Sequence, residues 1–574
     1  MLANSGTSDK VLLCGFVEGE FPMSKSNLPG VGLYYHPEAY SISGPKLMGR
    51  NAAGESFLRG LLQHIKTNGF YVQLDNPAHL DGFSAAAKQF GRMEPVQSVQ
   101  AQTLGKMTQA GVVFHPGPGI GAHAQQRSFW GDQAWSLCGI THTTSSARAM
   151  DAITGLLTTP VQPWDALICT SHAVKANVTA LLDREMGFLQ ARLGASKQVL
   201  PQMPVIPLGI HTADFEFGPA ARQAARLAIG LAQDEVAVLF MGRLSFHAKA
   251  HPWQMYQALE AAAKATGCKI ALIECGWHAN DALKEAFVQG AQQGCPSVRH
   301  ITLDGRDAQN RDHVWAGADI FCSLSDNIQE TFGISPIEAM AAGLPVVVSD
   351  WDGYRDSVRH GVDGFTIPTI MPRAGLAGDL AHRHALQIDS YDMYIGQASM
   401  MTSVDMRALI AAFTDLIKDP QLRSKMGSAG RARAKDCYDW GAVIPQYQAL
   451  WADLNDRRSA AVGHKTQTWP ARPDPYVAFA GYATHTLSEE TILRPTEPTA
   501  QALMDRYRAL MDLMMLNYCK RLMLPDETLQ QIFAAASPDG QTAAQIIQSV
   551  PAGRRPQTLR ALGLLVKIGL FERA

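Results

Sequence analysis

Short apolar or β-branched runs alternate with amphipathic stretches of helical period from residue 30 to about residue 450. Continuous apolar runs of this length, separated by helices, are typical of parallel strands that are covered on both faces. The pattern therefore predicts α/β architecture. The predicted strands are residues 32–36, 69–74, 111–115, 138–142, 166–171 and 203–208, followed by 236–242, 269–275, 300–304, 319–325 and 344–350.

This number of strands is too large for one doubly wound sheet, so the chain is predicted to contain several domains. We expect two Rossmann-like domains in tandem, over residues 1–215 and 216–453. Residues 454–475 combine charges and prolines without any period, which predicts a linker. Residues 476–574 are expected to form a small, mainly helical unit.

Composition narrows the class of protein. The chain has 50 Lys+Arg against 52 Asp+Glu, a net charge of −2, which argues against a nucleic-acid-binding protein. The nine cysteines include no C-x-x-C pair, so most are expected to be buried apolar residues in a reducing compartment. The first twenty residues do not resemble a signal peptide, and no uncharged apolar run approaches the roughly 20 residues that span a bilayer. We expect a cytoplasmic protein, and a contact with a membrane surface stays open.

The stretch from Glu330 to Glu338, with sequence ETFGISPIE, carries the most chemical information. Ser335 can cap a helix and Pro336 suits its first position, so the N–H groups of residues 332–334 are expected at a helix N-terminus. Such a terminus favours a phosphate. Because the two glutamates would repel phosphate, in a functional site they must accept hydrogen bonds from ribose or sugar hydroxyls. In the structural alternative, Ser335 and Glu338 form a capping box and Glu330 is an ordinary loop carboxylate.

The spacing E-x7-E, with EAMAAGLPVV after it, resembles the donor-binding signature of retaining glycosyltransferases of the GT-B fold, the glycosyltransferase family 4 type. The resemblance covers roughly residues 30–450, and further landmarks follow in order. These are Ala53-Gly54-Glu55 with Gly69–Val72, then Ile206–Ile210, Met241–Leu244 followed by Lys249, and Asp363-Gly364-Phe365, which looks like the loop that closes a strand.

The resemblance implies two Rossmann-like domains that face a cleft, with the last helix before residue 453 crossing back to the first domain. It also implies transfer of a sugar from a nucleoside diphosphate to an acceptor hydroxyl with retention of configuration. We expect no metal and no other cofactor to take part. The acceptor could be a glycan, a lipid-linked glycan, a protein or a small molecule. The implied diphosphate-binding groups are Arg243, Lys249, Phe332, Gly333 and Ile334, with Gly54 in the N-terminal glycine loop. Glu338 would hold the ribose and Glu330 the transferred sugar, and His142 would lie beside that sugar.

Two other motifs suggest different chemistry. Residues 119–124 fit G-x-G-x-x-A, but no acidic residue follows at the distance that a dinucleotide site needs. Asp350-Trp351-Asp352 resembles a metal-binding D-x-D motif, yet Arg243 and Lys249 already supply positive charge. A sugar-nucleotide epimerase of the same architecture is a further alternative, against which the E-x7-E spacing and His142 argue.

The C-terminal unit carries a separate signal. Residues 497–524 are predicted to form one long amphipathic helix, and residues 541–574, with five basic side chains against one acidic, resemble a winged-helix module. This unit could contact nucleic acid, a protein partner, a second copy of the chain or acidic lipid. We favour an interaction or dimerisation role. A sugar-nucleotide sensor that acts through this unit is therefore the second class of function that we consider.

Overall fold

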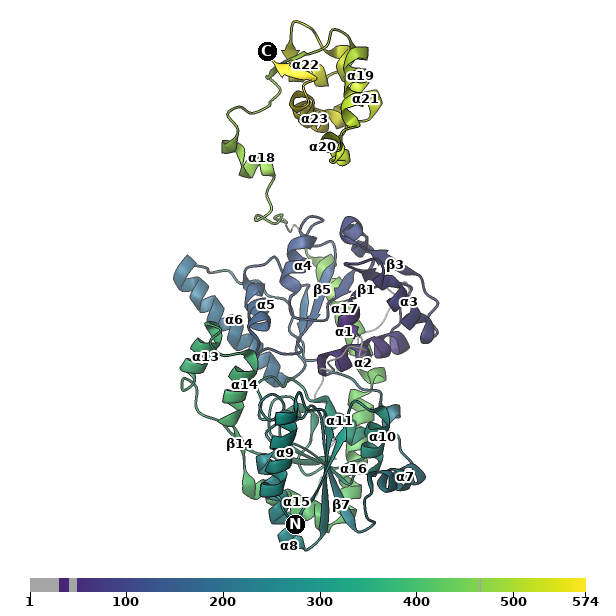
Figure 1. The fold of residues 1–574 in the computed structure, drawn as a ribbon, viewed down its shortest axis with the longest axis vertical. Coiled ribbons are helices and arrows are strands. Elements are labelled where there is room, and N and C mark those ends of the chain that lie inside the picture. The colour runs from purple at the N-terminus through teal and green to yellow at the C-terminus, as the bar shows by residue number, and fades with distance from the viewer. Residues whose placement is uncertain (1–29, 41–48, 463, 465) are drawn as a thin grey trace, which may run out of the picture. The chain divides into compact units, whose positions relative to one another are not determined.

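The computed structural model describes residues 30–40, 49–462, 464 and 466–574 (Figure 1). The chain divides into two compact units, one that ends at Trp469 and one from Pro470 to Ala574. The first unit contains two six-stranded sheets, and the second contains a three-stranded sheet with helices. The predicted α/β class with two Rossmann-like domains is confirmed.

The first sheet is parallel throughout, with the order β3-β2-β1-β4-β5-β6. Its strands are β1 (Val31–Tyr34), β2 (Phe70–Gln73), β3 (Val96–Val99), β4 (Val112–Phe114), β5 (Ser136–Ile140) and β6 (Ala166–Ile168). Its helices are α1 (Pro37–Tyr40), α2 (Gly49–His64), α3 (His79–Gln89), α4 (Ile120–Arg127), α5 (Ala147–Thr154) and α6 (His172–Leu193).

One strand prediction for this domain fails, and one observed strand was not predicted. Residues 203–208 form no strand, only a single bridge between Val205 and Cys169, because Pro204 and Pro207 lack the N–H groups that a ladder needs. The edge strand β3 was missed because Gln97 and Ser98 interrupt its apolar pattern.

The second sheet is also parallel, with the order β12-β11-β10-β7-β8-β9. Its strands are β7 (Glu235–Met241), β8 (Lys269–Gly276), β9 (Arg299–Asp304), β10 (Ile320–Ser323), β11 (Val346–Ser349) and β12 (Gly364–Ile367). Its helices are α7 (Pro219–Ile229), α8 (Trp253–Thr266), α9 (Asp281–Gly294), α10 (Ala308–Gly317), α11 (Ile334–Ala341), α12 (Tyr354–Ser357), α15 (Met406–Lys418) and α16 (Pro420–Arg433).

Alternate residues of β7 show that this sheet is covered on both faces. Ala237 and Leu239 belong to one hydrophobic core, whereas Val238 and Phe240 belong to another. All five strands predicted here are confirmed. The sixth, β12, starts at Gly364, where a loop was expected. A Cβ at Gly364 would lie 1.9 Å from the carbonyl oxygen of Val346, so the close approach of the two strands requires glycine.

The helix α17 (Trp440–Ala460) joins the two domains. It packs against α2, β4 and β5 of the first domain, and Trp440 Nε1 donates a 2.8 Å hydrogen bond to Ser56 Oγ. The Trp440 ring is fully buried against Gly60 and Gly209, where a Cβ would lie within 2.3 Å and 2.5 Å of it. The expected return of this helix to the first domain is confirmed. It continues to Ala460, so the predicted linker is helical over 454–460.

An excursion follows β12. It contains β13 (Thr369–Ile370), α13 (Gly378–Ala385), α14 (Tyr391–Met400) and β14 (Ser403–Val404). The strands β13 and β14 pair antiparallel, which closes the excursion. Tyr391 Oη and Ser145 Oγ, from the first domain, form a 2.8 Å hydrogen bond.

The C-terminal unit contains an antiparallel sheet of order β16-β15-β17. Its elements are β15 (Ile492–Pro495), α19 (Ala500–Met511), α20 (Met514–Asn517), α21 (Asp526–Ala535), β16 (Gln541–Thr542), α22 (Ala543–Ile547), α23 (Arg555–Lys567) and β17 (Phe571–Arg573). The single helix predicted over 497–524 is wrong: α19 ends at Met511, because Leu513 adopts an extended conformation. The winged-helix resemblance stays a prediction.

The structure also bears on two expectations from composition, which concern membrane-spanning segments and the burial of the cysteines. Among the helices of the described residues, none is long and apolar enough to cross a bilayer. The cysteines described as free are mostly buried, as expected; the buried ones are Cys138, Cys169, Cys275, Cys295 and Cys322.

Candidate functional site

The carboxyl ends of β7 and β10 lie side by side at the middle of the second sheet. In the order β12-β11-β10-β7-β8-β9, the chain turns outward in opposite directions from this pair. Ligands of open α/β sheets bind in the crevice outside the strand ends at such a switch point. Arg243 and Lys249 follow β7, and Glu330 follows β10, so the fold brings three predicted site residues to this edge.

Glu330 and Lys249 form an ion pair at this edge. Lys249 Nζ donates to Glu330 Oε2 at 2.5 Å, and the N–H of Thr331 donates to Oε1 at 3.3 Å. Burial alone would raise the pKa of Glu330, but the Lys249 ammonium and the N–H groups of Thr331 and Phe332 hold it below the ordinary value. Burial opposes the charge of Lys249, yet Glu330 outweighs it and raises the pKa of the ammonium. Both groups are therefore charged at neutral pH.

Arg243 lies beside Lys249. Its Nη2 donates a 2.8 Å hydrogen bond to the carbonyl oxygen of Ala248, which folds the guanidinium over the turn from 244 to 248. The positive charge of Arg243 acts to lower the pKa of Lys249, as two neighbouring cations must. Gly242, with φ 153°, starts this turn, and the Lys249 chain packs over it. The turn thus gathers two cations in one place, as the sequence predicted.

The helix α11 begins differently from the prediction. Its N-cap is Gly333, with φ 83°, and no side chain caps it, so the predicted cap at Ser335 and the capping box with Glu338 are wrong. Glycine is required because a Cβ at Gly333 would lie 1.8 Å from the Tyr354 ring. The first N–H groups of any helix, here those from Ile334 onward, have no partner inside it. They offer the expected binding site for an anion at the end of β10.

Glu338 lies on the first half of α11 and is half-buried. Burial raises the pKa of its carboxyl to about 7, against the opposing charges of Lys249 and Arg311. Within the described part of the chain, its carboxylate has no hydrogen-bond partner. The capping role predicted for this residue therefore fails, and a half-buried carboxyl without a described hydrogen-bond partner remains near Lys249.

The first domain meets this site through the loop before α11. Thr331 Oγ1 donates a 3.0 Å hydrogen bond to the carbonyl oxygen of His142, and Thr170 Oγ1 donates a 3.2 Å hydrogen bond to the carbonyl oxygen of Thr331. The structure therefore brings His142 next to the loop that carries Glu330. His142 also lines a cavity of the first domain, whose other lining residues are Tyr40, Ala53, Gly54, Phe57, Phe114, Pro116, Ile140 and Leu208.

Gly54 has a different place from the one that the resemblance implies. It lies inside α2 and not in a loop. A Cβ here would lie 1.9 Å from the carbonyl oxygen of Ala39, so the missing side chain allows α2 to pack closely on α1. Gly54 shares a cavity with His142, but nothing in the described residues connects it to Arg243 or Lys249.

Asp352 is a site residue whose role the sequence did not reveal. Its φ of 43° is rare for a residue other than glycine. Ser171 Oγ, from the first domain, donates to Oδ1 at 3.2 Å, while Oδ2 is buried without a partner among the described residues. Burial, and then the charge of Glu330, raise its pKa to about 7. Strained residues of this kind gather at functional sites.

The D-x-D motif does not act as a pair. Asp350 lies 3.6 Å from Arg355 Nε, whereas Asp352 accepts from Ser171. Among the described residues, no three His, Cys, Asp or Glu side chains are grouped closely enough to hold a metal ion.

Tyr354 is a second residue of this region that the sequence did not reveal. It is fully buried, packs on Gly333 and shares a 2.9 Å hydrogen bond with Ser323. No local pattern marks it, because its partners lie elsewhere in the chain.

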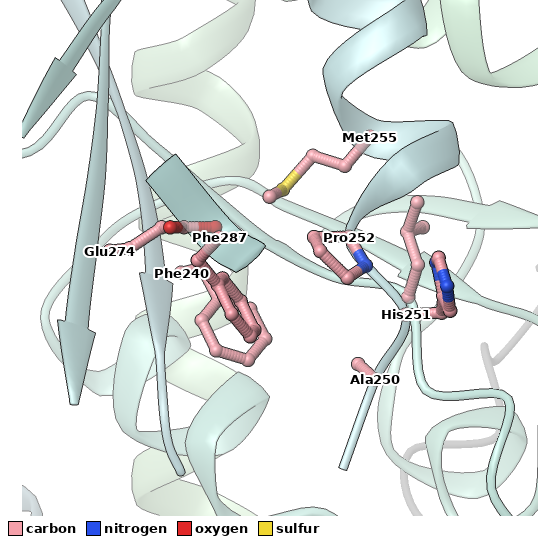
Figure 2. A pocket seen from close by; sticks show the side chains of 8 residues that line it. Phe240, Ala250, His251, Pro252, Met255, Glu274 and Phe287 are labelled. Atoms are coloured by element: carbon pink, nitrogen blue, oxygen red, sulfur yellow. The ribbon is translucent and has the colours of Figure 1, made fainter. Parts of the chain in front are cut away.

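A second cavity is lined by Phe240 and Ala250, which flank in the chain the turn that holds the cations (Figure 2). Phe240 and Phe287 lie on one side of it, and His251 and Pro252 on the other. Its lining residues are Phe240, Ala250, His251, Pro252, Met255, Glu274, Phe287 and Leu324. Glu274 is already engaged: Tyr256 Oη donates to it at 2.7 Å, and His300 Nε2 lies 2.8 Å away. The cavity is thus mainly apolar.

Comparison with known proteins finds similarity over the segment that carries this site. Residues 222–374 match the family model described as glycosyl transferases group 1. The chain is 32% identical over 172 residues to a phosphatidyl-myo-inositol mannosyltransferase of Mycobacterium leprae (strain TN), which covers 30% of this chain and 35% of that protein. It is 29% identical over 168 residues to a D-inositol 3-phosphate glycosyltransferase of Nocardia farcinica (strain IFM 10152), covering 29% of this chain and 36% of that protein. The chain thus spans about a third of the length of these curated relatives.

Among solved structures, Anabaena HepE in complex with UDP is 16% identical, with a TM-score of 0.48, over 74% of this chain and all of that one.

Proposed function

We propose that this chain is a group 1 glycosyltransferase that moves a sugar from a nucleoside diphosphate to an acceptor hydroxyl, with retention of configuration and without a metal. The match over residues 222–374 supports the family, and that segment contains Arg243, Lys249, Glu330 and Glu338. The observation that carries the proposal is the grouping of two cations, a helix N-terminus and an ionised carboxylate at one switch point.

The cations and the helix suit a diphosphate leaving group. Negative charge grows on the leaving phosphate as the bond to the sugar breaks, and fixed donors aimed at it stabilise that charge. Lys249 uses one of its three N–H groups on Glu330, and Arg243 uses a donor on Ala248, so both keep donors for phosphate oxygens. The N–H groups from Gly333 and Ile334 add the positive end of α11. We propose metal independence because the protein itself supplies the positive charge that would otherwise come from a metal ion.

The carboxylates suit hydroxyl groups. In this proposal Glu330, held ionised by Lys249, accepts a hydrogen bond from the transferred sugar. Glu338, whose carboxyl has no described partner, binds the ribose. His142 lies beside the reacting sugar, next to the Thr331 hydroxyl. Gly54 can contribute only as a neutral wall of the cavity that His142 lines.

In the single-step reaction that we propose, retention requires the acceptor to attack on the face from which the diphosphate leaves. The bond from the anomeric carbon to the phosphate oxygen breaks, the bond from that carbon to the acceptor oxygen forms on the same face, and the acceptor proton passes to the leaving phosphate. Contacts such as Thr170 with Thr331, and Ser171 with Asp352, hold the two domains together and exclude water from the reacting groups.

Thermal-shift measurements with UDP-, GDP- and ADP-sugars test the proposal, because a ligand that binds only the folded state raises its stability. We expect one nucleotide class to raise the unfolding temperature and to be consumed, by transfer or by slow hydrolysis. No response to any of the three classes would contradict the proposal. Binding without any consumption would favour the sugar-nucleotide sensor acting through the C-terminal unit.

A further inference from the structure

Two neighbouring histidines of the first domain, the buried His115 and the half-buried His123, have ring nitrogens without hydrogen-bond partners among the described residues. The rings of His115 and His123 stack with their centroids 3.8 Å apart. His115 is only 3% exposed, and within the described residues neither of its ring nitrogens has a partner; Nδ1 of His123 also has none. Buried polar groups are rarely left in this state, so an unpaired set of three nitrogens needs an explanation.

These rings lie at the switch point of the first sheet. In the order β3-β2-β1-β4-β5-β6, the chain reverses direction between β1 and β4. Tyr34 ends β1, His115 directly follows β4, and the Tyr34 ring lies 5.7 Å from each of the two histidine rings. A ligand crevice is expected at this edge. The next residue after His115, Pro116, lines the same cavity as His142.

The chemistry of the group is neutral and rich in hydrogen-bonding atoms. Burial lowers the pKa of both His115 and His123, so each ring is uncharged at pH 7 and offers a donor on one nitrogen and an acceptor on the other. Tyr34 is half-buried, and its hydroxyl donates to Asp75 Oδ2 at 2.5 Å. Asp75, which accepts this bond, places a carboxylate near the rings, and its negative charge would repel an anionic ligand.

We propose that Tyr34, His115 and His123 bind the acceptor ring of the transfer reaction, and that this ring is an uncharged polyol, a sugar or a cyclitol. The unpaired imidazole nitrogens exchange hydrogen bonds with ring hydroxyls, and the Tyr34 face packs against the ring carbons. This inference rests on the proposed function and narrows its acceptor from any hydroxyl compound to an unphosphorylated ring. The ring is either free or the end of a longer glycan.

Saturation-transfer difference NMR on the full chain tests this assignment. The uncharged probes are methyl α-glucoside, methyl α-mannoside and myo-inositol, and maltose represents a ring within a glycan. The charged probes are glucose 6-phosphate, mannose 6-phosphate and myo-inositol 1-phosphate. The variants are His115→Phe and His123→Phe, which keep the stacking and remove nitrogens. His485→Phe, an exposed histidine of the C-terminal unit, is the matched control.

We expect at least one uncharged probe to bind, and binding to weaken about fivefold or more in His115→Phe and His123→Phe but not in His485→Phe, since each variant loses a hydrogen bond. A signal from maltose alone would support the ring of a longer glycan. No signal from any uncharged probe, equal binding of the phosphorylated probes, or unchanged binding in a folded His123→Phe variant would overturn the assignment.

Because His123 is half-buried, that variant keeps the test valid if His115→Phe does not fold. Parallel titration with sugar nucleotides separates the two failures: donor binding without ring binding contradicts only this inference.

Discussion

Single residues explain why the site was only partly predictable from the sequence. Arg243, Lys249, Glu330 and Glu338 stand out by their spacing, and the structure gathers them at one sheet edge. The ion pair between Glu330 and Lys249, 81 positions apart, could not be predicted, because it depends on which strands are neighbours. The sequence pattern predicts a helix cap at Ser335, whereas Gly333 is the cap residue in the structure.

Glu330→Gln should lower turnover about 100-fold. An uncharged amide stabilises the Lys249 ammonium and the transferred sugar far less than the carboxylate does. The same change leaves Lys249 without its counter-ion, so we also expect a loss of about 1–3 kcal/mol in unfolding free energy. Steady-state kinetics and thermal unfolding check these values. Glu285→Gln, on the exposed surface of α9, is the control, and equal turnover in both variants would rule out a role for Glu330.

Asp352 should make stability depend on pH. Its pKa is raised from 3.8 to about 7 in the folded chain, so the folded state binds the proton more tightly than the unfolded state does. The stabilisation from protonation is complete below pH 4 and is lost as pH rises towards 7. Asp352→Asn removes this loss. The unfolding temperature of the variant minus that of the parent should therefore be about 2–4 °C larger at pH 8 than at pH 4.

Thermal unfolding at both pH values measures that gain. A constant difference between parent and variant across the range would mean that the pKa of Asp352 is the same in the folded and unfolded chains, which would contradict the raised value.

At the scale of elements, the central strands were predicted well, whereas only two of the four edge strands, β6 and β9, were predicted. The central strands of both sheets are continuous apolar runs, whereas β3 and β12 lie at sheet edges and mix polar residues or glycine into the run. Helix ends depended on contacts made elsewhere in the chain. The start of α11 is set by the Tyr354 ring, which arrives from beyond β11.

Gly333→Ala should therefore be severely destabilising. The methyl group would lie 1.8 Å from the Tyr354 ring, at a φ of 83° that alanine rarely adopts. We expect a loss of at least 2 kcal/mol, roughly the sum of the backbone strain and the clash, in denaturant unfolding. Gly187→Ala, inside α6 with open space around it, should instead be neutral or stabilise by about 0.5–1 kcal/mol. Similar effects of the two substitutions would show that α11 does not start as described.

At the scale of the whole molecule, the order of domains was predictable because each has its own alternation of strands and helices. The extent of α17 was not predictable, since the charged residues at the exposed end of this helix have the composition of a linker. The two units of the chain are each compact, with separate hydrophobic cores. Donor binding should accordingly belong to the first unit alone.

A chain ending at Trp469 should bind the same sugar nucleotide as the full chain, with a dissociation constant changed less than about threefold, because the proposed contacts all lie before that residue. Titration of both chains checks this value. A loss of binding on truncation would transfer the proposed site to a surface that includes residues 470–574.

The most direct test of the central claim is calorimetric titration of the preferred sugar nucleotide into the parent chain, Arg243→Gln and Arg306→Gln. Arg306 is an exposed arginine paired with Asp304 at the end of β9, so it controls for loss of one positive charge near the same sheet. We expect Arg243→Gln to weaken binding at least tenfold, since a charge-assisted bond to phosphate is lost. Arg306→Gln should bind like the parent. Equal affinity in all three chains, or no binding in the parent, would contradict the account.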